Sequence, residues 1–147
     1  MASTMQFKFT VQPDRQLRRN LRRLPQDVRR AAARKALRPG AELLVGEVKA
    51  EMAAKDIRRT GRGIESIGYT IKLEKLYKDE MQAEIGPIMP QGWYLHFIEF
   101  GTGPRKGRGM VTAKPFMEPA FNRVVGEIND LIGRTLAVEI EKAAAKR

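Results

Sequence analysis

The stretch Tyr94-Leu-His-Phe-Ile-Glu-Phe-Gly-Thr102, followed by Lys114-Pro-Phe-Met-Glu-Pro-Ala-Phe121, decides how this chain is organised. The first part is a dense apolar and aromatic run that ends at a glycine. The second part is a Pro-Phe start of a long amphipathic helix. Because these two parts and the segment between them offer little catalytic chemistry, the pattern favours a protein that docks onto other proteins over one that turns over a substrate.

The apolar run predicts a short helix that ends at Gly101. Its polar side chains His96 and Glu99 are three residues apart, which places them on one face of a helix, whereas a strand would separate them. Glycine accepts the left-handed conformation that often closes a helix. We therefore expect Gly101 to have a positive φ, Phe100 to be buried, and Glu99 to be hydrogen-bonded instead of catalytic.

The segment between the two parts, residues 103–113, is rich in glycine and carries Arg105, Lys106 and Arg108 just ahead of Lys114. Such a segment cannot bury enough apolar surface to order itself, so we expect a mobile loop that orders on a partner. It lacks the Gly-Lys-Ser/Thr ending of a phosphate-binding loop. An acidic protein surface and the DNA backbone both remain open as its partner.

The rest of the chain predicts further helices on both sides. Downstream, a helix starts at Pro115 or Pro119 and runs to about residue 144. Upstream, the apolar stripe Leu17, Leu21, Leu24, Val28 and Ala31 has helical spacing. Pro25 separates a short first helix from a second one, because proline is accepted at a first helical position. Proline in a helix interior removes a hydrogen bond, so we expect a kink or break at Pro39-Gly40.

Alternating apolar residues predict three strands, over 6–12, 67–73 and 81–85, the last two forming an antiparallel hairpin. Arg59 to Gly63 is expected to be a loop. The fold class is thus α+β, in a single domain over residues 1–147. Its expected parts are an N-terminal strand or arm (1–14), a helical region (15–55), a sheet with loops (64–118) and a C-terminal helix (119–145).

The net charge of +11 is concentrated in two places. Asp14 to Arg38 holds ten basic and two acidic residues, for +8, and Gly103 to Lys114 adds +4, so the rest of the chain carries −1. A polyanion is the natural partner of such surfaces, through release of condensed counterions. A solvated helix face and a solvated loop are the alternative, and the sequence does not choose between them.

Little in the chain points to catalysis or a cofactor. His96 and Glu99 lack the third and fourth ligands of a metal site, since the chain has one histidine and no cysteine. Ser66 has no elbow-like glycine setting. No run approaches the length of a membrane span, no signal pattern opens the chain, and the absence of cysteine suits a reducing cytoplasm. We therefore expect no enzyme, cofactor, metal or membrane contact.

Three motifs in order make the chain resemble the neck proteins of long-tailed bacteriophages, the gene-product-ten-like family of head–tail joining and tail-completion proteins. They are Thr60-Gly-Arg-Gly-Ile-Glu-Ser-Ile67, the Glu99-Phe-Gly-Thr102 signature, and Lys114-Pro-Phe-Met-Glu-Pro-Ala120 before the last helix. The resemblance covers residues 15–140. The chain departs from the family pattern at Gly63, where leucine is common, and at Arg59, where proline is usual.

The resemblance implies a structural virion protein at the head–tail junction, made in the host cytoplasm. Such a protein joins a ring around the DNA channel and contacts the tail terminator, the connector or the stopper. It implies a homo-oligomer in the virion, which can be a monomer in isolation, and nonspecific contact with packaged DNA. The motif residues expected at the protein interface are Glu99, Phe100, Gly101, Thr102, Pro115, Phe116 and Pro119. The alternatives are a free-standing basic protein that binds nucleic acid without sequence preference through Arg15 to Arg38, and a tail terminator proper.

Overall fold

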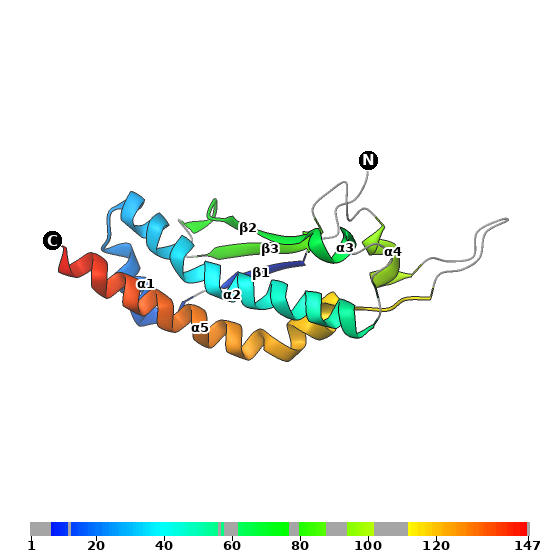
Figure 1. The fold of residues 1–147 in the computed structure, drawn as a ribbon. Coiled ribbons are helices and arrows are strands. Elements are labelled where there is room, and N and C mark those ends of the chain that lie inside the picture. The colour runs from blue at the N-terminus through cyan, green and yellow to red at the C-terminus, as the bar shows by residue number, and fades with distance from the viewer. Residues whose placement is uncertain are drawn as a thin grey trace. The chain divides into compact units, whose positions relative to one another are not determined.

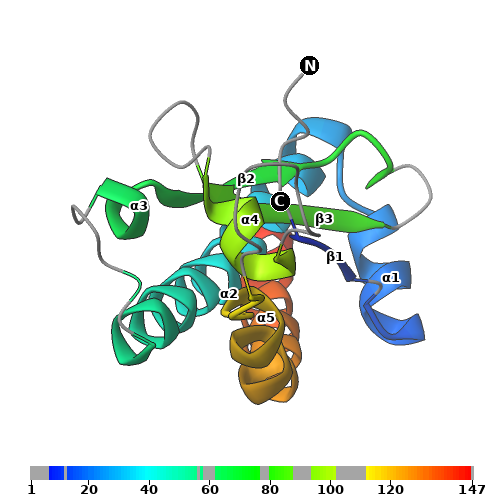
Figure 2. The ribbon, with the colours of Figure 1, turned by 90° about the vertical axis from the view of Figure 1, so that its right-hand side faces the viewer.

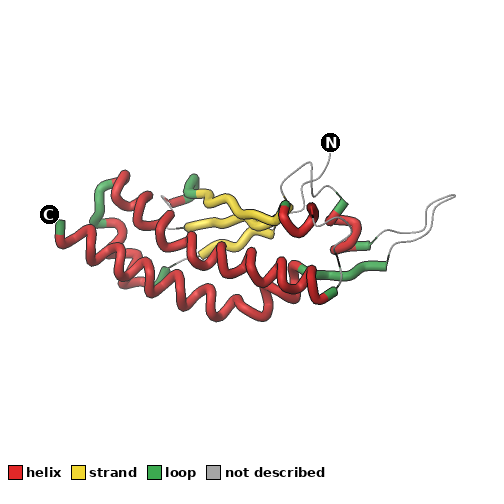
Figure 3. The backbone as a smooth tube through the Cα atoms, in the orientation of Figure 1, coloured by secondary structure: helices red, strands yellow, loops and turns green. Residues whose placement is uncertain are grey.

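The computed structural model of the protein describes residues 7–11, 13–55, 57, 62–76, 80–87, 94–101 and 112–146. The described elements follow one another as β1 (Phe7–Val11), α1 (Arg15–Arg22), α2 (Gln26–Ala54), α3 (Arg62–Glu65), β2 (Ile67–Lys72), β3 (Met81–Pro87), α4 (Leu95–Phe100) and α5 (Met117–Ala145) (Figure 1). Long helices and a small antiparallel sheet make up this part of the chain (Figure 3), which confirms the predicted α+β class.

The chain divides into two compact units, each of which is described by itself. Unit 1 comprises Met1–Phe7, Leu44–Gly68 and Ile85–Val124. Unit 2 comprises Lys8–Leu43, Tyr69–Glu84 and Val125–Arg147. The helices α2 and α5 contribute residues to both units, so each unit contains one part of each long helix.

In unit 2, the turn between α1 and α2 lies where Pro25 predicts it. Asp14 caps the start of α1, because its Oδ1 accepts the Leu17 N–H at 2.9 Å. At the other end, the guanidinium of Arg29 donates to the carbonyls of Arg22 (3.0 Å) and Leu24 (3.2 Å). A cation beside the last carbonyls of a helix stabilises its C-terminus. Both ends of this short helix therefore have a side chain that satisfies their backbone groups.

Of the kink or break predicted at Pro39-Gly40, the break is wrong, because α2 is one helix from Gln26 to Ala54, and the kink stays a prediction. Proline there still removes one backbone hydrogen bond. The residues around it, Leu37 and Ala41, are fully buried, and this packing outweighs the local preference. The buried contacts of these residues, and not the local sequence preference, keep α2 helical at Pro39.

Gly40 lets α2 approach α5 closely within unit 2. An added Cβ would lie 3.0 Å from Ile132 Cδ1 and 3.1 Å from Ile128 Cγ2. One turn towards the start of α2, Lys35 Nζ lies 3.8 Å from a carboxylate oxygen of Glu139. The two helix segments therefore run antiparallel in contact.

The three strands pair in the order β1-β3-β2, and the α2 and α5 segments of unit 2 cover one face of the sheet (Figure 2). On β3, Met81 and Ala83 are fully buried. Glu84 lies between two lysines of the flanking strands, with Lys8 Nζ at 3.4 Å and Lys72 Nζ at 3.9 Å. The two strands predicted for this hairpin are confirmed, but burial in β3 alternates only from Met81 to Ala83, because Glu84 to Pro87 are all buried as well.

Each unit has its own apolar core. The buried apolar residues of unit 2 are Phe9, Leu21, Leu24, Ala32, Ala33, Ala36, Leu37, Ala41, Leu73, Leu76, Met81, Ala83, Ile128, Ile132, Leu136 and Ile140. Those of unit 1 are Leu44, Val48, Met52, Ile57, Ile67, Ile85, Leu95, Phe116, Met117, Ala120 and Val124. The loop expected over 59–63 is partly wrong: residues 59–61 lie outside the described residues, but Arg62 already begins α3.

Candidate functional site

The start of α5, in unit 1, is held by a carboxylate from a different helix. Glu99 on α4 is only 3% exposed, and its Oε2 accepts the backbone N–H groups of Phe116 (2.7 Å) and Met117 (3.1 Å). Its Oε1 accepts the N–H of Glu118 at 3.3 Å. The first N–H groups of a helix have no partner within the helix and attract negative charge. Glu99 therefore serves as the cap of α5 from 17 residues away.

The segment before α5 is fixed on two further sides. The Lys114 backbone N–H donates to the carbonyl of Ile98 on α4 at 2.7 Å. The ammonium of Lys55, at the end of α2, donates to the Pro115 carbonyl and lies 3.3 Å from Glu51. Residues 114–118 are thus bonded to α4 and to the end of α2 at the same time.

Gly101 ends α4 in a conformation that only glycine adopts readily. Its φ is 73° and its ψ is 176°, and its N–H donates to the Phe97 carbonyl at 2.8 Å. This region is nearly closed to residues with a Cβ. The expected positive φ at Gly101 is therefore found, although ψ lies outside the left-handed helical region.

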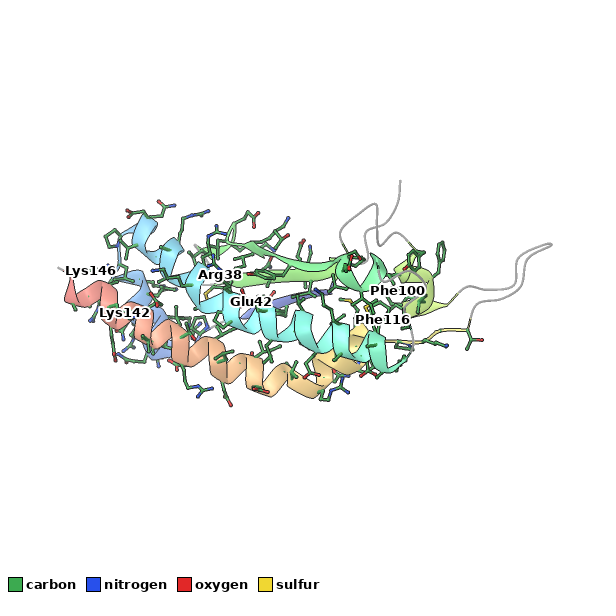
Figure 4. All side chains as sticks on the ribbon, viewed as in Figure 1. Arg38, Glu42, Phe100, Phe116, Lys142 and Lys146 are labelled. Atoms are coloured by element: carbon green, nitrogen blue, oxygen red, sulfur yellow. The ribbon has the colours of Figure 1, made fainter. Side chains whose placement is uncertain are left out.

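The expectation that Phe100 is buried is wrong. Its side chain is 67% exposed, and Phe116 is the fully buried aromatic of this region instead (Figure 4). The cause is the register of α4. Leu95 and Glu99 lie one turn apart and face inward, so the next residue is turned away from the core. A large apolar side chain thus stands in solvent directly beside the buried cap.

A second ion-pair network joins the start of α5 to the end of α2. Arg123 Nη2 lies 2.7 Å from Glu51, and Arg123 Nε lies 3.3 Å from Glu47. The hydrogen bond from Arg123 lowers the pKa of Glu51 below its usual value, against the opposing effect of burial. The same bonds raise the pKa of Arg123. Sequence reasoning missed this network, although the four-residue spacing from Glu47 to Glu51 to Lys55 could have indicated it.

The structure describes only some of the other predicted site residues. Pro119 is half-buried in the first turn of α5, where its missing N–H leaves no bond unmade, and Lys114 is exposed. Four predicted site residues lie outside the described residues: Thr102, Arg105, Lys106 and Arg108. Among the described residues, no three His, Cys, Asp or Glu side chains gather as a metal site, and no helix is both long and apolar enough to span a bilayer. The expected absences of a metal and of membrane contact stay predictions.

The fold and this junction define a small α+β protein in which Glu99 holds α4 to the start of a long helix and leaves Phe100 exposed. A protein-family model described as "Bacteriophage HK97-gp10, putative tail-component" matches residues 15–101, more than half of the chain. The chain belongs to this HK97-gp10-like family of phage tail components. Comparison with curated proteins and with solved structures gives no match.

Proposed function

We propose that the protein is a structural virion protein of the head–tail interface, where it joins a ring that contacts the tail terminator or the connector around the DNA channel. Membership of a tail-component family supports a place among the phage structural proteins. The observation that carries the finer proposal is Phe100, which is 67% exposed at the end of a helix fixed by the buried Glu99. A neighbouring virion protein would cover this side chain.

The setting of Phe100 suits a docking anchor. Binding energy at protein interfaces concentrates in a few large, often aromatic side chains. An anchor on a rigid element loses little conformational freedom when it binds. The residue before Phe100 makes three hydrogen bonds to the start of α5, and the residue after it has a glycine-specific backbone. Phe100 is therefore presented to a partner in a fixed position.

We also propose that the protein is not an enzyme. The buried polar residues of the described part of the chain are Ser66, Glu84 and Glu99. Glu84 is paired with two lysines, and Glu99 is occupied by backbone N–H groups. Ser66 is likewise not free of partners. Engaged groups of this kind support a structural role, because a catalytic acid or base must be available to a substrate.

Ring formation would use the same surface of each copy against a different surface of the next, as closed head-to-tail assemblies do. Each copy carries a net charge of +11, so copies repel one another in the absence of an acidic partner. A monomer in solution is therefore compatible with a ring in the particle. The basic residues Arg105, Lys106 and Arg108 are proposed, from sequence alone, to contact an acidic neighbour or the packaged DNA.

The test compares phage particles that carry Phe100→Ala with particles that carry Val138→Ala. Val138 is the other large apolar side chain exposed in the described residues, at 46%, and it lies on α5 in unit 2. Electron microscopy counts joined particles, free heads and free tails, and labelling locates the protein. We expect a neck location, normal joining with Val138→Ala, and accumulation of unjoined heads with Phe100→Ala.

Two outcomes would overturn the parts of this proposal separately. If labelling finds the protein away from the head–tail junction, the proposed position is wrong. If Phe100→Ala particles join as well as wild type, the position stands but Phe100 is not the anchor. The thermal stability of both purified variants should equal that of wild type, which separates a docking defect from a folding defect.

A further inference from the structure

The structure divides the basic residues between Asp14 and Arg38 into those that the fold uses and those that it leaves in solvent. Arg29 caps the end of α1, and Lys35 is paired with Glu139. By contrast, Arg15 and Arg19 on α1 and Arg30 and Arg34 on α2 are exposed. No acidic side chain among the described residues forms an ion pair with any of these four arginines. We call these four residues the arginine rows.

Helix stability explains the arginine rows only in part, because Arg19 lies in the last turn of α1, where a cation is favourable, but the other three arginines do not lie at a helix C-terminus. Arg15 and Arg19 are four residues apart, as are Arg30 and Arg34, and like charges at this spacing repel along a helix. Among the other exposed cations of the described chain, Lys8 and Lys142 have acidic partners, whereas Lys75, Arg134 and Lys146 form no ion pair with a described acid. Asp14, which directly precedes α1, accepts a backbone N–H as its cap. The charge of the rows is therefore compensated only by solvent ions or by a partner.

The kind of partner follows from what the rows lack. The large apolar side chains exposed in the described residues are Phe100 on α4 and Val138 on α5, so α1 and α2 themselves carry no exposed apolar anchor of the kind protein interfaces use. Residues 13–43 also contain no aromatic side chain, so there is no ring on which an unpaired base could stack. What remains is recognition of a regular array of negative charge.

We propose that the arginine rows bind the phosphate backbone of double-stranded DNA without reading its sequence. Within each row the two arginines lie about 6 Å apart along the helix axis, because a helix rises about 1.5 Å per residue. This spacing is of the order of one to two steps along a duplex strand, which carries a phosphate every ~3.4 Å of axis. The guanidinium fork suits phosphate oxygens and stays charged at every relevant pH. Binding by these contacts is independent of where in the particle the protein lies.

The test measures affinity of the purified full chain for a mixed-sequence duplex of about 30 base pairs, by fluorescence anisotropy, between about 50 and 200 mM salt. The variant is Arg19→Gln/Arg30→Gln/Arg34→Gln. Glutamine has nearly the same helix propensity as arginine, so α1 and α2 are preserved. The matched control is Lys75→Gln/Arg134→Gln/Lys146→Gln, which removes the same charge from exposed positions outside the rows.

We expect the slope of log affinity against log salt to fall by about 2.7 in the row variant, or about 0.9 for each lost phosphate contact. Affinity at 0.1 M salt should then fall by more than about 100-fold. The control should change the slope by less than about 0.9. The single variants Arg19→Gln and Arg34→Gln, each expected to lower the slope by about 0.9, replace the triple variant if it does not fold.

Equal slopes for the row variant and the control would overturn the proposal, because the attraction would then be diffuse. Absence of duplex affinity in the wild-type protein would overturn it as well and would direct attention to an acidic protein partner. Tighter binding to a single strand than to the duplex would contradict the absence of stacking. None of these results alters the particle-joining test of Phe100, so the two proposals succeed or fail separately.

Discussion

The buried cap formed by Glu99 makes the sharpest prediction about stability. Replacing Glu99 by alanine removes a carboxylate that accepts three backbone N–H groups at the start of α5. Two of these N–H groups belong to the buried residues Phe116 and Met117, so losing the carboxylate leaves buried donors without their partner. The variant should therefore fold less stably, with the loss located at the junction of α4 and α5.

The size of the loss follows from the contacts. Loss of a helix cap costs about 0.5–2 kcal/mol, and loss of hydrogen bonds to a charged group costs about 1.5–3 kcal/mol. The two estimates describe the same bonds, so they are not added, and about 3 kcal/mol is the expected change in the free energy of unfolding. For a chain of this length the melting temperature should fall by about 6–12 °C.

Urea denaturation followed by circular dichroism measures this change, and the slope of unfolding free energy against urea concentration should be the same for the variant and the wild type. Glu118→Ala is the matched control, since it removes the same charge from the same helix start but from an exposed side chain. Its expected cost is about 0.3–1 kcal/mol, from the helix dipole alone. Glu99→Gln keeps the shape of the side chain and loses its charge, so its loss of unfolding free energy should lie between those of Glu99→Ala and Glu118→Ala. A Glu99→Ala loss no larger than that of Glu118→Ala would refute the capping role.

Three further predictions concern stability. Gly101→Ala should cost about 1 kcal/mol or more in unfolding free energy, because φ is 73° there; an unchanged urea midpoint would show that the turn relaxes freely. Gly46→Ala should raise the free energy of unfolding by up to about 1 kcal/mol, because nothing lies within 4 Å of the added Cβ. Gly40→Ala should lose that gain, because its added Cβ would lie 3.0 Å from Ile132 Cδ1. Equal melting temperatures for the two variants would contradict the close approach of the helices. Burial and the bond to Glu42 raise the pKa of Tyr69, so its stabilising contribution is complete below pH ~10 and is lost as pH rises through the raised pKa. Tyr69→Phe should therefore flatten the alkaline fall in melting temperature, and an unaltered profile would count against this bond.

Local patterns were sufficient to predict most of the fold. Apolar alternation predicted β1, β2 and β3, and Pro25 predicted the turn between α1 and α2, because each of these signals acts over a few residues. The break expected at Pro39 is absent for the opposite reason. There the local cost of proline is real, but contacts with residues about 90 positions away along the chain decide the outcome, and a single sequence does not display those contacts.

At the candidate site, too, local patterns predicted the elements but not the contacts between them. The spacing of His96 and Glu99 predicted a helix for α4, and the glycine predicted its end. Which of two adjacent residues faces the core depends on where α4 lies against Phe116, and this placed Glu99 inside and Phe100 outside. The bonding of Glu99 was predicted, but its partners at the start of α5 were not, because no spacing rule connects a carboxylate to N–H groups 17 residues later.

The cap on α5 also has a consequence for hydrogen exchange. The amide protons of Phe116 and Met117 are held by Glu99, and the amide proton of Lys114 is held by Ile98, so all three depend on α4 for their bonds. Segments that share bonds in this way open together as one cooperative unit. The first turn of α5 therefore cannot fray as a free helix end does, and it exchanges its protons with solvent only when α4 detaches as well.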